Sequence, residues 1–171
     1  MFTTETFEIQ SFLHYFEGIR ARTVRVADCI PPEQIEWRIR PGAFSFGDQL
    51  RHLGAIERYM FAENARRRAS RYPGHSSELA EGYSAVREYL DRMHRESVEI
   101  LSGLKREDLE AKCLTPAGSQ ITVWKWLRAM IEHEVHHRGQ IYLGLGQLGV
   151  VTPPLYGLTS EEVRDRSREI G

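Results

Sequence analysis

Apolar residues recur along the chain at alternating steps of three and four positions, which is the spacing of one face of an α-helix. Four separate segments show this spacing, whereas the alternation typical of a half-buried strand is nearly absent. Pro31 ends the first segment, and Ser45 with Asp48 resembles a capping box at the start of the second. The positions on the four faces are Ile9, Phe12, Phe16, Ile19, Thr23, Val26 and Ile30; Phe46, Leu50, Leu53, Ile56 and Met60; Leu79, Tyr83, Val86, Leu90, Met93, Ser97, Ile100 and Leu104; and Val123, Leu127, Met130, Ile141, Leu145 and Leu148.

Four amphipathic helices joined by loops predict an all-α fold, a four-helix bundle that forms one domain over residues 1–171;. The second helix is expected to end before Pro73. After the fourth helix we expect a tail or a short helix, capped by Thr159 or Ser160. The link between the first two helices is long enough for a crossover, so the order of up and down helices stays open.

The composition is that of an ordinary globular protein, with 41% hydrophobic and 27% charged residues;. Because 23 basic residues balance 24 acidic ones to a net charge of −1, no strong field favours nucleic acid or an anionic membrane;. Three successive arginines, residues 66–68, are expected to complement the dipole at a helix end. We therefore expect no nucleic-acid partner and no membrane partner.

Two further features of the sequence indicate where the protein is located and which kinds of site it does not contain. The longest apolar run, residues 59–62, is far too short to cross a membrane;. Glu5, Glu8 and Glu17 stand where a signal peptide would be basic and then apolar, so we expect a cytoplasmic protein. The only cysteines, at positions 29 and 113, exclude a disulfide framework and a cysteine-based zinc finger;.

The most distinctive polar residues lie in the fourth helix, where residues 131–140 read Ile-Glu-His-Glu-Val-His-His-Arg-Gly-Gln. His133 and His137 project about 40° apart, at the edge of the apolar face. His136 points roughly 100° away from His137, toward the outside. Two imidazoles one turn apart at the edge of a core are costly unless they have partners, and a divalent metal ion would satisfy both.

Two histidines make an incomplete metal site, so a third ligand must come from another helix. His52 flanks the apolar face of the second helix, and packing of this helix against the fourth would bring His52 toward the pair. Three imidazoles leave at least one coordination position open, as in catalytic rather than structural metal sites. The alternative is an ordinary, partly buried His52 and an exposed polar patch at 133–137.

Two other metal motifs fit parts of the same helix. The segment from His133 to His137 matches HExxH, in which two histidines bind zinc and Glu134 would activate water. No histidine follows His137, so the third ligand would be Glu161 or Glu162, and the β-sheet that usually precedes such a helix is missing. A di-iron carboxylate bundle needs two ExxH segments, and the chain has only one.

Three parts of the sequence together resemble the DinB/YfiT-like family. They are Ser45-Phe-Gly-Asp-Gln-Leu-Arg-His52-Leu, His133-xxx-His137-Arg-Gly-Gln140-Ile and Pro153-Pro154-Leu-Tyr-Gly. The resemblance spans nearly the whole chain and implies a four-helix bundle that binds one divalent metal ion per chain. The family's ligand positions fall on His52, His133 and His137, the three that the helix geometry selects. Because many members are dimeric, the resemblance also implies a homodimer.

Related members of this family are S-transferases that use bacillithiol, mycothiol or a similar small thiol, and others are described as metal-dependent hydrolases. The resemblance therefore implies a small-molecule substrate and an ion that activates either a thiol or a water. Zinc and nickel suit three nitrogen ligands, with iron, cobalt or manganese as alternatives. A bundle that binds metal or a second copy without catalysis is a third reading of the same residues.

Other polar residues are candidates for supporting roles around the three histidines. Glu134 is the first candidate base, and Glu57 projects similarly on the second helix; each is equally suited to a buried salt bridge with Arg138 or another arginine. Gln140 and His136 are expected to orient a ligand or the substrate without binding the ion. The remaining histidines are expected to lie apart from the site: His14 and His94 on helix surfaces, and His75 in a loop.

Overall fold

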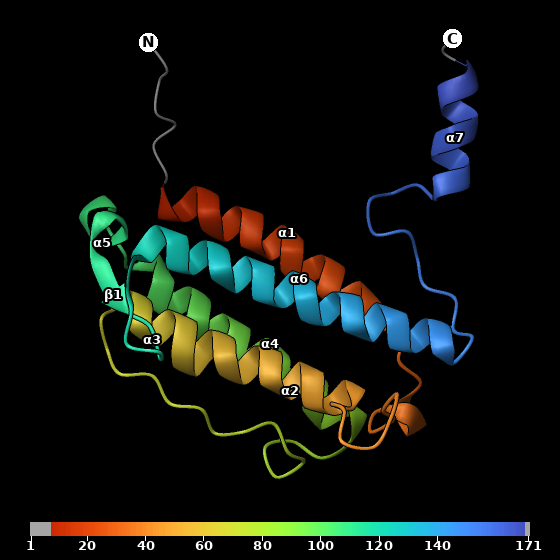
Figure 1. Ribbon diagram of the computed structural model, residues 1–171, viewed down its shortest axis with the longest axis horizontal. Helices are drawn as coiled ribbons and strands as arrows, with labels where there is room; N and C mark the ends of the chain where they lie inside the picture. Colours follow the sequence, from red (N-terminus) through yellow and green to blue (C-terminus); the bar gives the residue numbers. More distant parts are fainter. Residues whose placement is uncertain (1–7, 170–171) are drawn as a thin grey trace.

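Four long helical rods form the fold of residues 8–169, the part of the chain that this computed structural model describes (Figure 1). The second rod is continuous, because a π-helical turn joins its two α-helical segments. The elements in order are α1 (Ile9–Ala27), the 3-10 turn η1 (Pro32–Gln34), α2 (Phe46–Ile56), the π-helix η2 (Glu57–Phe61), α3 (Ala62–Ala65), α4 (Gly82–Ser102), α5 (Arg106–Glu110), β1 (Lys112–Leu114), β2 (Gln120–Thr122), α6 (Val123–Gln147) and α7 (Ser160–Glu169). This is the four-helix bundle with a short C-terminal helix that the sequence predicts.

Side-chain caps fix the starts of two helices where the sequence predicts them. At α2, the Asp48 N–H donates to Ser45 Oγ and the Ser45 N–H donates to Asp48 Oδ2, both at 2.9 Å, which completes the capping box;. At α7, Thr159 is the cap: the Glu162 N–H donates to Thr159 Oγ1 at 3.2 Å, and the Glu162 carboxylate accepts from the Thr159 N–H at 2.6 Å. These caps satisfy backbone donors that have no partner inside the helix.

Two helices are shorter than their predicted apolar faces. α1 ends at Ala27, although Ile30 beyond it is still buried. α4 begins at Gly82 rather than near Leu79, because the φ of 79° at Gly82 does not continue a right-handed helix;. An apolar spacing therefore continues past a helix end when the turn beyond it also packs against the core.

A short antiparallel hairpin, β1–β2, is an element that the sequence analysis does not predict. Its three pairs are Lys112 with Thr122, Cys113 with Ile121 and Leu114 with Gln120. Strands of three residues are too short to show a clear alternation of apolar and polar positions. The hairpin connects α5 to α6 and so sets the point at which α6 begins.

The rods follow an up-down-down-up order. In Figure 1, α1 and α6 lie side by side and run the same way, whereas α2–α3 and α4 run the opposite way. The crossover is therefore residues 66–81, between α3 and α4, and not the link between the first two helices. It runs back along the second rod: the Arg71 N–H donates to the Tyr59 carbonyl at 3.0 Å, and the Ala80 carbonyl accepts from Arg51 at 2.9 Å.

Apolar side chains fill two core clusters, one toward each end of the bundle. Phe16, Leu101 and Leu127 lie in the first and Leu50 and Ile141 in the second, and all five are fully buried. Arg20, His94 and Glu134 are buried polar side chains that lie between these clusters along their helices. Within residues 8–169, no helix is both long enough and apolar enough to span a membrane.

A buried charge cluster occupies this middle layer and is built from all four rods. Arg20 of α1 forms ion pairs with Glu57 of η2 and with Glu134 of α6, the latter at 2.8 Å. His94 of α4 contacts Glu57 at 2.9 Å and Glu17 at 3.2 Å. His94 is therefore buried, and its expected place on a helix surface is wrong. Its ring nitrogens find carboxylate partners that the spacing along α4 does not reveal.

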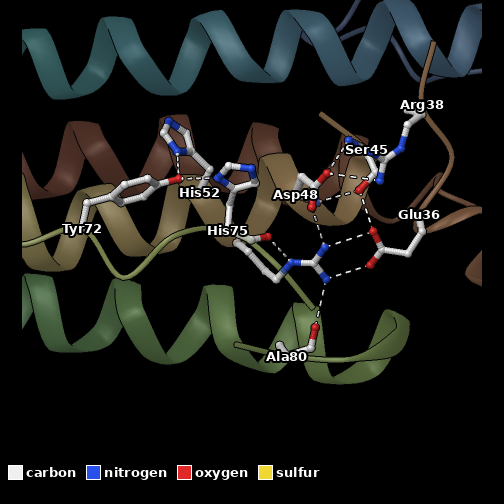
Figure 2. Close-up of polar contacts among 9 residues, drawn as sticks. Glu36, Arg38, Ser45, Asp48, His52, Tyr72, His75 and Ala80 are labelled. Carbon is white, nitrogen blue, oxygen red and sulfur yellow. Dashed lines mark hydrogen bonds and ion pairs between the residues drawn. The ribbon is translucent and has the colours of Figure 1, made fainter. Parts of the chain in front are cut away.

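Arg51 of α2 ties the crossover to the second rod through hydrogen bonds to the carbonyls of His75 and Ala80, two residues labelled in Figure 2. Its side chain is fully buried and uses all five N–H donors. Nε donates to the His75 carbonyl at 2.7 Å, and Nη1 donates to the Ala80 carbonyl at 2.9 Å. The remaining donors reach Glu36 at 2.8 and 3.0 Å and Asp48 at 2.9 Å. One guanidinium thus joins α2, the segment before it and two points of the crossover.

Because Gly47 has no side chain, it leaves space for the hydrogen bonds between Arg51 and Glu36. A Cβ at position 47 would lie 2.7 Å from Glu36 Oε1 and 3.1 Å from Arg51 Nη1. Because heavy atoms do not approach this closely without a hydrogen bond, a side chain there would displace the carboxylate from the guanidinium.

We expect Arg51→Ala to lower the free energy of unfolding by about 3–5 kcal/mol, because it leaves carboxylates and carbonyls without their buried donor. Urea unfolding followed by circular dichroism measures this change. The matched control is Arg106→Ala, which removes an exposed ion pair with Glu110 and should leave stability nearly unchanged;. Equal stability of the two variants would contradict the role given to Arg51.

Candidate metal centre

Three imidazoles from two rods converge at the middle of the bundle. His52 comes from α2, and His133 and His137 come from α6; one ring nitrogen of each lies within 4.8 Å of the others. Nε2 of His52 is 3.0 Å from Nε2 of His133. The ring centroid of His137 is 4.7 Å from that of His52 and 4.6 Å from that of His133. The structure therefore brings together the three residues that the sequence predicts as metal ligands.

Close packing of α2 against α6 places His52 opposite the pair. Gly144 of α6 makes this approach possible, since a Cβ there would lie 2.7 Å from the ring of Phe46, the first residue of α2. His133 and His137 are four positions apart on α6, so both project toward α2 one turn from each other. A glycine seven positions after the last ligand thus helps to set the distance between the two helices.

All three imidazoles are held neutral by their surroundings. Burial and the neighbouring histidines lower the pKa of His52 to about 4 and that of His137 to about 3. Burial and His136 lower the pKa of His133 to about 4. Neutral imidazole is the form that binds metal ions, so the cluster is ready to accept a cation at neutral pH. Three nitrogen donors fit zinc, nickel, cobalt or iron.

Hydrogen bonds from outside the cluster orient two of the rings. The Tyr72 hydroxyl, on the crossover, lies 2.7 Å from Nδ1 of His52 and 2.7 Å from Nδ1 of His75 (Figure 2). When Nδ1 of His52 donates to the phenol, the phenol donates to His75, and Nε2 of His52 keeps its lone pair for the ion. The pKa of Tyr72 is raised to about 12 by burial and by Asp48, so the phenol keeps its proton.

Gln49 orients the ring of His137 in the same way. Its Oε1 lies 3.4 Å from Nδ1 of His137, where it can accept the ring N–H and leave Nε2 free. Such contacts fix the tautomer and the orientation of a ligating histidine. Phe44 closes this side of the cluster: its ring centroid lies 5.4 Å from that of His52 and 6.3 Å from that of His137.

Glu134 points away from the three histidines. Its carboxylate pairs with Arg20 at 2.8 Å in the buried charge cluster, and burial raises its pKa. This is the salt bridge that the sequence analysis weighed against a role as base, with Arg20 as the partner instead of Arg138. Glu161 and Glu162, the third-ligand candidates of the HExxH alternative, lie at the start of α7. Glu161 lines a hollow with Val135 and Tyr142 of α6, and neither glutamate joins the three-histidine cluster of the described residues.

Gln140 and His136 pair with each other on the outer side of α6. The Gln140 amide nitrogen lies 2.7 Å from Nε2 of His136, and the His136 ring centroid lies 5.1 Å from that of His137. Gln140 therefore contacts His136, and the ring of His136 in turn lies beside that of His137. Their expected role in orienting a ligand or substrate stays a prediction.

Four neighbours of the cluster are not among the residues predicted from the spacing along the sequence: Phe44, Gln49, Tyr72 and His75. Gln49 precedes His52 by three positions on α2, so a helix projection could have found it. The other three lie in loops, where no periodicity predicts which side chains meet. Two of them reach His52 because the crossover runs back along α2.

We expect protein purified without an affinity tag, then reconstituted with Zn²⁺ or Ni²⁺, to hold about one ion per chain. His52→Ala and His137→Ala should each lower this content at least tenfold, because each removes a ligand. Tyr72→Phe should keep the ion but weaken its affinity about tenfold, since only the orienting hydrogen bond is lost. Mass spectrometry and competition with a chelator measure content and affinity.

The control for these variants is His14→Ala, which removes an exposed histidine of α1. Its metal content should equal that of the unchanged protein. Metal retained in His52→Ala and lost in His137→Ala would contradict the two-helix site and favour the HExxH alternative.

Metal binding should depend little on pH between about 5.5 and 7.5, because the lowered pKa values keep all three imidazoles neutral over this range;. Ordinary histidines would together release about two protons on binding at pH 6. We expect fewer than one, counted by calorimetry in buffers of different ionisation enthalpy. Release of two protons would contradict the lowered pKa values.

Several solved structures share this fold. A DinB-like protein from Bacillus cereus ATCC 10987 is 19% identical with a TM-score of 0.71, over 85% of this chain and 95% of that one. YfiT from Bacillus subtilis, described as a probable metal-dependent hydrolase with an unusual four-helix bundle topology, is 14% identical with a TM-score of 0.65, over 88% and 95%. A mycothiol-dependent maleylpyruvate isomerase is 12% identical with a TM-score of 0.60, over 89% of this chain and 65% of that one.

Comparison of the sequence with curated proteins finds no significant match. The family model of the DinB superfamily matches residues 15–141, which include the three histidines and most of the four rods. The chain therefore belongs to the DinB superfamily.

Proposed function

We propose that this protein is a divalent-metal-dependent enzyme that activates a low-molecular-weight thiol for transfer to an electrophilic carbon. The observation that carries the proposal is the cluster of three neutral imidazoles on α2 and α6. Structural metal sites use four protein ligands, whereas three leave a position for a reactant. The similarity of fold to a mycothiol-dependent enzyme is consistent with a thiol as that reactant.

The surroundings of the cluster favour a thiol over water. Activation of water for hydrolysis is commonly assisted by a carboxylate base beside the metal. Within residues 8–169, the hydrogen bonds and ion pairs of His52, His133 and His137 include no carboxylate. Glu134, the candidate base, is instead paired with Arg20. A thiol needs less help, because its pKa is already near 8.5 in water.

The chain's own residues orient the imidazoles that would hold the ion. An ion in this place would supply the positive charge that lowers the pKa of a thiol further. Tyr72 and Gln49 contact Nδ1 of His52 and of His137, which would leave Nε2 of both rings free to hold an ion, and the Phe44 ring lies against the same two histidines. In the transfer, the thiol releases its proton to solvent and its sulfur forms a bond to the electrophilic carbon. The carbon's leaving group departs with the electron pair of the broken bond.

Metal-dependent hydrolysis is the second candidate, and the description of YfiT as a probable hydrolase supports it. In this reaction a water would take the place of the thiol. Glu134 would have to leave Arg20 to act as its base, so Glu134→Gln with metal retained distinguishes the two readings. Loss of ester turnover in that variant would favour the hydrolase.

We expect the metal-loaded protein to speed the reaction of a small thiol with monochlorobimane, and His137→Ala to lower the rate at least about a hundredfold. The thiols compared are bacillithiol, mycothiol, glutathione and cysteine, and fluorescence of the bimane adduct measures turnover. His14→Ala is the control and should retain full activity. Failure of all four thiols with fully loaded protein, across several electrophiles, would contradict the proposal.

A further inference from the structure

A cavity of about 160 Å³ opens beside the metal centre, between the segment before α2 and the second half of α6. Three of its walls are the aromatic rings of Trp37, Phe44 and Phe46. Ile39 and Leu143 add aliphatic walls. No residue that lines it carries a charged side chain. An uncharged, apolar group therefore fits this cavity better than an ion, which would lose its water without gaining a partner.

The cavity shares two walls with the three-histidine cluster. Phe44 lines the cavity, and its ring is stacked near His137 and meets His52 edge-on. Gln49 also lines the cavity, and its side-chain oxygen is the hydrogen-bond partner of His137 Nδ1. A group that occupies the cavity thus lies against the side chains that orient and enclose the ligands.

The walls of the cavity are fixed by close packing. Trp37 and Phe46 stack with ring centroids 5.3 Å apart. A Cβ at Gly144 would lie 2.7 Å from the Phe46 ring and 3.2 Å from Trp37. The absence of a side chain at Gly144 therefore allows both rings to pack against α6. The packing of Trp37 and Phe46 against α6 therefore fixes one side of the hollow.

Two large apolar side chains among the walls are exposed to solvent. Ile39 is 51% exposed and Leu143 is 59% exposed. Exposed apolar side chains that gather around a hollow mark a binding surface more often than single ones do. A ligand in the cavity would cover part of both and so gain from their burial.

We propose that this cavity binds an uncharged aromatic or similarly sized apolar group of the electrophilic substrate, and so determines which electrophiles react. The inference rests on the proposed function and names the substrate class of the same site. The size supports it, because an apolar cavity of about 150 Å³ accommodates a benzene ring. The position supports it as well, because the cavity adjoins the cluster at which the thiol would react.

The first test measures binding of benzyl alcohol to the metal-free protein by ¹H–¹⁵N NMR, with the indole signal of Trp37 as reporter. We expect benzyl alcohol to bind at least about tenfold more tightly than benzoate, which has the same ring and a charge. Leu143→Ser and Ile39→Ser should each weaken binding about threefold to tenfold, because each removes an apolar wall. Both positions are more than half exposed, so these variants should fold;.

The matched control is Val151→Ser, since Val151 is 91% exposed and does not line the cavity. Its affinity for benzyl alcohol should be unchanged. Equal binding by the control and both wall variants would overturn the inference, as would a probe that shifts signals elsewhere and leaves Trp37 unaffected. Because the protein is metal-free here, failure of thiol transfer would not alter this result.

The second test uses the metal-loaded enzyme with one thiol and two electrophiles. Benzyl bromide carries an aromatic ring, and iodoacetamide does not. Leu143→Ser should lower kcat/KM for benzyl bromide about threefold to tenfold and leave that for iodoacetamide unchanged. An equal loss for both electrophiles would overturn the inference while leaving the proposed thiol transfer intact.

Discussion

The geometry of the site depends on the hydrogen bonds that the buried guanidinium of Arg51 donates. It occupies the position before His52 on α2, and its five N–H donors bind Glu36, Asp48 and two carbonyls of the crossover. The crossover in turn presents Tyr72 to His52. A residue outside the three-histidine cluster thus places both His52 and the group that orients it. A charge this deep is tolerated because none of its donors is left without a partner.

The polar interior of the bundle is divided into two parts by the geometry of α6. His133 and Glu134 are neighbours in sequence, yet successive residues of a helix point about 100° apart. His133 therefore faces α2 and the ligand cluster, whereas Glu134 faces Arg20 of α1. The charged layer includes residues of all four rods, and the imidazoles are kept neutral beside it. This arrangement explains why a literal HExxH match need not place its glutamate beside a metal ion.

Local spacing predicted the four rods and the three converging histidines, because each depends on which face of a helix a residue occupies. His133 and His137 are one turn apart on a single helix, and His52 lies beside an apolar face that must meet another rod. The crossover, the β1–β2 hairpin and the contact from Tyr72 to His52 were not predicted. They depend on how loops travel across the bundle, for which the spacing carries no information. His94 was misplaced for a related reason, since its partners Glu17 and Glu57 lie on other rods.

The up-down-down-up order also affects how the chain reaches its native state. His52 and His133 are 81 residues apart in sequence, and two parallel rods are joined by a connection that runs the length of the bundle. Contacts between distant parts of a chain slow folding relative to a bundle of successive hairpins. The three histidines meet only after α6 has docked against α2, so an ion held by them would bind the folded chain far better than the unfolded one. By mass action, the supply of metal in the cell would then govern how much of the protein persists in its folded form.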